Sequence, residues 1–176
     1  IRYCAIQGMT PVFLTYKPSL LSDIFRDVAD IESLDLFKNV FTVNNVKITD
    51  FYDTNKPLFK AMKAAEHKKI IQDGELPENT DLVLATYSQF SQRLSRSAKA
   101  QFLEKIAAKG KTFFRLDESH IAAGESNIHT NIAAALDVSS GAVFSSATAL
   151  KNTKSVKLDK SIFPPSINPD TLPEIF

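Results

Sequence analysis

The stretch Lys111–His120, KTFFRLDESH, decides the fold, because in it a strand runs directly into a pair of acidic residues. Thr112–Leu116 is a mostly apolar run that predicts a buried strand, and Lys109–Lys111 before it predicts a turn. In an open parallel sheet, ligands bind at the carboxyl ends of the strands. Two adjacent carboxylates at such an end, Asp117 and Glu118, suit a site for magnesium and a nucleotide.

The two acidic residues would have different roles in that site. Asp117 would hold Mg²⁺ through water, because this ion keeps much of its hydration shell in proteins. Glu118 would orient or deprotonate the water that attacks the γ-phosphate of ATP. A simpler interpretation is also open, in which the pair lies in a solvated turn or at a helix N-terminus, where carboxylates favour the helix dipole. The rest of the chain distinguishes the two interpretations.

The composition is that of a globular domain. The chain has 176 residues, 44% hydrophobic and 23% charged, which is enough for one domain with a core. Its net charge of +1 gives no overall attraction for nucleic acid, so such binding requires a local patch. Cys4 is the single cysteine, which excludes an internal disulfide and fits a reducing compartment. We therefore expect a cytoplasmic location for a bacterial or phage-encoded protein and a nuclear one for a eukaryotic protein.

The sequence has no sign of a membrane segment. No apolar run reaches the roughly 18 residues that a membrane-spanning helix needs. Ile1–Gly8 lacks the charged start and apolar block of a signal peptide. It reads instead as the last turns of a helix that ends at Gly8. We therefore expect no membrane partner, and we expect the chain to be a piece of a longer protein.

Apolar, strand-like runs alternate with helical periodicity along the chain. This alternation predicts an α/β fold, a parallel sheet between two layers of helices with right-handed crossovers. The predicted strands are Thr10–Thr15, Asp81–Tyr87, Thr112–Leu116 and Gly141–Ser146. One predicted helix begins at Pro18 or Ser19. Further helices are predicted at Leu58–Gln72, Ser97–Ala108 and Thr130–Leu136.

Two segments are open to more than one interpretation. Val40–Val43 and Val46–Ile48 both look like strands separated by Asn44-Asn45, so they form either a hairpin or one strand and an excursion. Four lysines on the predicted helix Leu58–Gln72 could contact phosphates, although such lysines more often form a solvated face.

Polar residues follow four of the predicted strands, and these ends meet at one edge if the sheet is parallel. The arrangement resembles the first motor domain of superfamily 2 helicases and translocases. Asp117–His120 is similar to motif II, the DExH form of Walker B, and Ser146–Thr148 is similar to motif III, the Ser-Ala-Thr signature. Thr15–Ser19 stands where motif Ia stands, and Thr86–Gln89 resembles the stretch near motif Ib.

A closer resemblance is to the strawberry-notch-like group and its bacterial and phage relatives, and it covers roughly residues 1–151. It implies a RecA-like P-loop NTPase domain at 1–150, followed at 151–176 by a Pro-rich arm or linker towards another domain. The motifs that carry it are Lys17-Pro18-Ser19-Leu20, Arg26-Asp27, Asp30-Ile31, Thr86-Tyr87-Ser88, Asp117-Glu118-Ser119-His120 and Ser146-Ala147-Thr148-Ala149.

The resemblance implies a role for each matching residue in an ATP-dependent motor that uses Mg²⁺ and ATP. Asp117 binds magnesium through water, Glu118 acts on the attacking water, and His120 couples the nucleotide state to the nucleic-acid face. Ser146 and Thr148 contact the acidic cluster and relay its state. The implied partners are nucleic acid, DNA in preference to RNA, and a second RecA-like domain. The implied contacts to one nucleic-acid strand come from Thr15, Lys17, Ser19, Thr86 and Ser88.

The chain departs from this pattern in two ways. It contains no G-x-x-x-x-G-K-[ST] sequence, and in the family that loop opens the helix whose end Ile1–Gly8 resembles. We therefore expect the domain to be truncated at its N-terminus, without the P-loop strand and most of the first helix. The second motor domain, which carries the arginine finger, is also missing from the sequence. Without both parts, residues 1–176 should not hydrolyse ATP by themselves.

Two other classes of function compete with this interpretation. The chain could be a non-catalytic nucleic-acid-binding or scaffold remnant that kept the fold and lost turnover. A Rossmann-type cofactor domain is disfavoured, because no G-x-G-x-x-G occurs. His67 and His129 have no metal-ligand spacing to another His or Cys, so no metal site is predicted at either residue.

Overall fold

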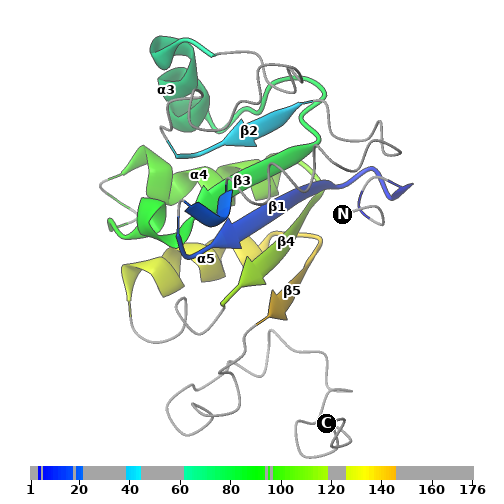
Figure 1. Cartoon of the computed structure of the whole chain (residues 1–176), viewed down its shortest axis with the longest axis vertical. Helices are drawn as coiled ribbons and strands as arrows, with labels where there is room; N and C mark the ends of the chain where they lie inside the picture. Colours follow the sequence, from blue (N-terminus) through cyan, green and yellow to red (C-terminus); the bar gives the residue numbers. More distant parts are fainter. Residues whose placement is uncertain are drawn as a thin grey trace, which may run out of the picture.

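A five-stranded parallel sheet organises the chain in the computed structural model, which describes residues 4, 6–17, 19–21, 39–44, 62–93, 95, 97–118 and 126–145 (Figure 1). The strand order is β2-β3-β1-β4-β5, with β2 at one edge of the sheet and β5 at the other. All four pairings are parallel. The strands are β1 Thr10–Thr15, β2 Val40–Thr42, β3 Leu82–Thr86, β4 Thr112–Asp117 and β5 Gly141–Ser145.

The strands differ in burial according to their place in the sheet. β1 and β3 are buried along almost their whole length, as expected for parallel strands that are covered on both faces. β4 instead alternates, with Phe114 and Leu116 fully buried and Arg115 exposed above the ring of Phe13. β5 has no fully buried residue, and Val143 at its centre is 50% exposed.

Each described helix has a local reason to begin or end where it does. The helices are α3 Ala64–Asp73, α4 Ala98–Lys109 and α5 Asn127–Asp137, and a 3₁₀ helix, η2, covers Tyr87–Phe90. Ser97 and Ser126 accept hydrogen bonds from backbone N–H groups in the first turns of α4 and α5. Gly74 ends α3 in the left-handed region at φ 64°, and a Cβ there would lie 2.4 Å from Cβ of Lys105 on α4. None of these described helices combines the length and apolar content needed to cross a bilayer.

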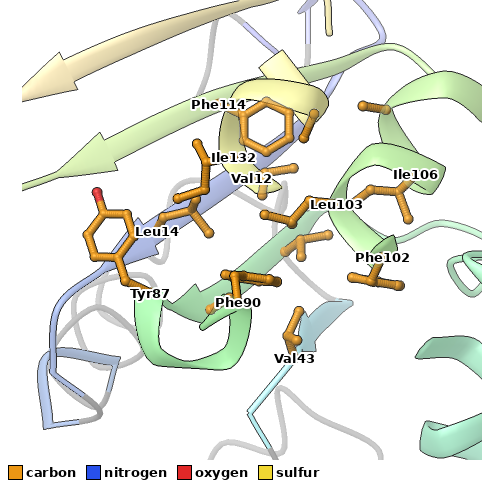
Figure 2. Close-up of a cluster of buried hydrophobic side chains, with 14 of the residues drawn as sticks. Val12, Leu14, Val43, Tyr87, Phe90, Phe102, Leu103, Ile106, Phe114 and Ile132 are labelled. Atoms are coloured by element: carbon orange, nitrogen blue, oxygen red, sulfur yellow. The ribbon is translucent and has the colours of Figure 1, made fainter. Parts of the chain in front are cut away.

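One face of the sheet packs against α4 and α5 to form the core. Figure 2 shows Val12, Leu14 and Phe114 from the strands in one cluster with Leu103 of α4 and Ile132 of α5. The same cluster extends to the β2 edge, where the rings of Phe41 and Phe102 lie 5.6 Å apart. The core therefore places β1, β3 and β4 rigidly relative to one another, and with them the residues that follow their carboxyl ends.

The parallel α/β fold predicted from the sequence is confirmed, with small shifts of the boundaries. Tyr87 opens η2 instead of ending β3, and α5 begins at Asn127 because Ser126 caps it. The structure has a strand at Val40–Thr42, whereas Val46–Ile48 lies outside the described residues, as do 58–61 of the predicted helix. Residues 22–38 and 146–176 also lie outside them.

Candidate active site at the carboxyl edge of the sheet

The register brings the polar strand ends to one edge of the sheet. Thr15 of β1 pairs with Thr86 of β3, and Asp117 of β4 pairs with Ser145 of β5. Leu14 pairs with Leu116, so Thr15 and Asp117 each follow one residue later on neighbouring strands. A row of hydroxyl and carboxylate side chains therefore crosses four strands where their carboxyl ends meet, the place where open parallel sheets bind ligands.

Asp117 is held from the neighbouring strand. The hydroxyl of Ser145 donates to Oδ1 of Asp117 at 3.1 Å and lies 3.3 Å from the carbonyl oxygen of Leu116. Asp117 is only half-buried, so its carboxylate remains accessible. The sequence pointed to Ser146 and Thr148 for this contact, and both lie outside the described residues, as does His120. Ser145 was missed because its contact depends on the pairing of β4 with β5.

Glu118 has an unusual backbone conformation. Its φ is +52°, in the left-handed region, which costs an L-residue about 1–2 kcal/mol. The carbonyl of the preceding residue, Asp117, accepts a hydrogen bond of 2.7 Å from the hydroxyl of Tyr87. Tyr87 is 1% exposed, and Figure 2 places it at the margin of the core cluster. The turn that carries the acidic pair is therefore anchored to the first residue of η2, across the sheet edge.

The surroundings of the Tyr87 hydroxyl keep it protonated, so that it can donate a hydrogen bond. Burial raises the pKa of the Tyr87 hydroxyl above its ordinary value, and the nearby negative charges of Asp117 and Glu118 raise it further. The phenol consequently stays protonated throughout the physiological range and donates to the Asp117 carbonyl.

Replacing Tyr87 with Phe should change how stability responds to alkaline pH. The folded-state pKa of Tyr87 lies above the unfolded-state value of about 10, so its contribution is present below that pH and is lost as the pH rises towards the folded-state pKa. We expect the free energy of unfolding to fall less steeply above about pH 10 in Tyr87→Phe than in the wild type. Urea denaturation at several pH values measures this. Tyr16→Phe, at a 50% exposed position, is the control, and equal slopes in the two variants would contradict the prediction.

A second polar cluster lies at the same edge, at the ends of β2 and β3. Asn44 Oδ1 accepts from the backbone N–H of Thr86 at 3.0 Å, and Asn44 Nδ2 lies 2.9 Å from Thr86 Oγ1. Thr86 Oγ1 in turn lies 3.0 Å from Ser88 Oγ. Asn44 is 6% exposed. The sequence places Asn44 either in a hairpin or after a single strand, and nothing local indicates its bonds to a residue 42 positions away.

The five residues predicted to contact nucleic acid differ in the exposure of their side chains. Thr15 and Thr86 are fully buried, so in this conformation their side chains cannot contact a phosphate. The Thr15 hydroxyl has no hydrogen-bond partner among the described residues. Lys17, Ser19 and Ser88 are exposed, and the Lys17 ammonium lies 5.8 Å from the centre of the Tyr16 ring. The exposed three are the ones able to make direct contacts.

His67 makes packing and hydrogen-bond contacts with β2. The ring of His67 stacks on Phe41, with centroids 5.3 Å apart, and its Nε2 lies 2.8 Å from the carbonyl oxygen of Thr42. These contacts tie α3 to β2. In the described part of the chain, no group of three or more His, Cys, Asp or Glu side chains gathers as a metal-binding set.

An open hollow of about 670 Å³ lies along α4 and the start of α5, away from the acidic pair. Arg93, Glu104 and Asn131 are among its lining residues, and none of the strand-end residues belongs to it. Asn131 is buried and its Nδ2 donates to the carbonyl oxygens of Phe90 and Gln92 at 2.8 and 2.7 Å. Its role is thus to hold α5 against the segment that follows η2.

Comparison of the chain with protein-family models, with curated proteins and with solved structures finds no match. The geometry of the carboxyl edge and the motifs in the sequence are therefore the indications of function.

Proposed function

We propose that this chain is part of the first motor domain of an ATP-dependent superfamily 2 helicase or translocase that acts on nucleic acid, on DNA in preference to RNA. The observation that carries the proposal is the placement of Asp117 and Glu118 at the carboxyl end of an inner strand. Ser145 of β5 and Tyr87 of η2 both donate to Asp117, and so fix the turn that carries Glu118. These two hydrogen bonds give the Asp117 carboxylate a defined position at the sheet edge, which supports a binding role.

The oxygen ligands at this edge suit magnesium. One accessible carboxylate, Asp117, is enough for an ion that keeps several waters and takes its other ligands from a nucleotide. When bound, such an ion neutralises charge on the phosphates that are being transferred. Ser145 keeps the Asp117 carboxylate oriented, and Glu118 orients or deprotonates the attacking water. By resemblance, His120, Ser146 and Thr148 connect this acidic cluster to the nucleic-acid face.

Nucleic acid would bind at the same edge. Lys17, Ser19 and Ser88 are exposed beyond β1 and β3 and offer one ammonium and two hydroxyl groups. Contacts of this kind fix the position of a phosphate backbone without reading its sequence. In this proposal a second RecA-like domain supplies the arginine finger that completes the site.

Residues 1–176 alone are expected not to hydrolyse ATP or to bind it with micromolar affinity. A P-loop binds phosphates through a row of backbone N–H groups, a helix N-terminus and a lysine, and this sequence contains no such motif. Calorimetric titration with Mg-ATP tests this. The comparison is with a longer polypeptide that includes the P-loop which the proposal requires upstream of Ile1, here called the parent polypeptide. Micromolar binding by residues 1–176 would contradict the superfamily plan for the nucleotide site.

The proposed function itself is tested on the parent polypeptide. Hydrolysis of Mg-ATP should rise when single-stranded DNA is added, because the two sites share one sheet edge. If the parent binds DNA but hydrolyses no ATP, the protein is a non-catalytic nucleic-acid-binding relative of the same fold, and the motor function is wrong.

A further inference from the structure

The hydrogen bonds at the ends of β2 and β3 have a determined direction. The Thr86 backbone N–H can only donate, so the Asn44 atom 3.0 Å from it has to be the amide oxygen. The amide nitrogen of Asn44 therefore faces the Thr86 hydroxyl at 2.9 Å and donates to it. Both residues are buried, which leaves no room for water to reverse this arrangement.

The Thr86 hydroxyl then has its own proton to place. Thr86 is 0% exposed, and among the described residues the acceptor in reach of this proton is Ser88 Oγ, at 3.0 Å. If Ser88 donated to Thr86 instead, the Thr86 proton would be buried without a partner, which costs about 1–3 kcal/mol. In the arrangement that gives every buried proton an acceptor, Asn44 therefore donates to Thr86 and Thr86 donates to Ser88. We call these three residues the Asn44–Ser88 relay.

The relay leaves Ser88 with a hydroxyl proton that points away from Thr86. Ser88 is exposed and follows β3 at the carboxyl edge of the sheet. A hydroxyl that already accepts one hydrogen bond is a better donor, because hydrogen bonds in a chain polarise one another. The end of the relay thus presents an O–H donor to whatever binds at this edge.

We propose that the Asn44–Ser88 relay orients the Ser88 hydroxyl as a donor to a backbone phosphate oxygen of single-stranded nucleic acid, with Asn44 as the positioning residue. The phosphate oxygens of a nucleic-acid backbone can only accept hydrogen bonds. A hydroxyl whose proton points outward can therefore bind them, whereas a hydroxyl that presents only lone pairs cannot. The identity of the ligand rests on the proposed function, whereas the direction of the relay follows from the contacts of the described residues alone.

Asn44→Asp tests the direction of the relay with almost no change of shape. One carboxylate oxygen still accepts from the Thr86 N–H, but the other now takes the Thr86 hydroxyl proton. Thr86 then accepts from Ser88, and the Ser88 proton turns inward. We expect the affinity of the chain for a labelled oligothymidylate, measured by fluorescence anisotropy at one fixed salt concentration, to fall about tenfold.

Matched variants separate this effect from added charge and from misfolding. Asn39→Asp adds the same charge at the other end of β2, where Asn39 is exposed, and should lower affinity much less. Thr86→Val removes the relay hydroxyl without adding charge. It leaves the Ser88 proton unoriented but not turned inward, so it should lower affinity less than Asn44→Asp, and Thr86→Ser, which keeps the hydroxyl, should bind like the wild type. Circular dichroism and thermal unfolding of each variant show whether it is folded.

A double-mutant cycle shows whether Asn44 acts through Ser88. Ser88→Ala should lower affinity to a similar extent, and adding Asn44→Asp to Ser88→Ala should lower it no further. An undiminished effect of Asn44→Asp in the Ser88→Ala background would overturn the relay, because a merely structural role of Asn44 predicts that result. Normal binding by Ser88→Ala would also overturn it while leaving the proposed function intact. Failure of the wild-type chain and of the parent to bind the oligothymidylate would overturn both.

Discussion

Glu118→Gln in the parent polypeptide is expected to lower the rate of ATP hydrolysis about a hundredfold or more, the scale typical of a lost general base. The amide of glutamine cannot accept the proton of the attacking water, and it orients that water less well. ATP binding should persist, because in the proposed site the P-loop and Mg²⁺ at Asp117 hold the phosphates. The stability of the fold should also persist, since glutamine has much the same cost as glutamate at φ +52°.

Steady-state hydrolysis together with nucleotide titration measures these two quantities separately. Glu75→Gln is the matched control, because it makes the same chemical change at a 71% exposed side chain that pairs with Lys109 at 3.0 Å. The control should hydrolyse ATP at the wild-type rate. Near-normal turnover in Glu118→Gln would remove Glu118 from the catalytic role and leave the acidic pair as a structural turn.

Phe114→Ala is expected to destabilise the fold by about 3–5 kcal/mol, the usual cost of emptying a buried phenylalanine site. Phe114 is 0% exposed and lies on β4 between Val12 of β1 and Ala142 of β5. Its ring packs in the cluster that joins the sheet to α4 and α5 (Figure 2). Since single domains are stable by only about 5–15 kcal/mol, this loss would remove a large part of the free energy of unfolding.

Urea denaturation followed by circular dichroism measures the difference in the free energy of unfolding. Val143→Ala on the neighbouring strand is the control, because Val143 is 50% exposed and should change stability by no more than about 0.5 kcal/mol. Similar losses in the two variants would mean that the Phe114 ring is not buried in the core on the β4–β5 side.

The elements themselves were predictable from the sequence because their signals are local. Continuous apolar runs bounded by turn residues located β1, β3 and β4, and helical spacing of apolar residues located α4. The sequence predicts that α5 starts at Thr130, three residues after its actual start at Asn127. The Ser126 cap outweighs the weak apolar pattern of the first turn.

The candidate site was predictable only in part. Asp117 and Glu118 stand out because two carboxylates directly follow an apolar strand, and the parallel fold then places them at the carboxyl edge. The residues that hold this pair do not stand out. Tyr87 lies 30 positions away from the carbonyl that it bonds, and Ser145 lies 28 positions away from the carboxylate. Neither separation leaves a periodic trace in the sequence.

The sequence by itself located β1, β3, β4, β5 and α4, indicated a parallel sheet, and placed the acidic pair at the end of a strand. Only the tertiary structure decided the order β2-β3-β1-β4-β5, the register, and hence the partners of each polar strand end. It also buried Thr15 and Thr86, which the motifs alone placed against nucleic acid, and it brought Asn44 to Thr86. The reason is physical: secondary structure follows from neighbouring residues, whereas register and burial follow from packing between strands far apart in the chain.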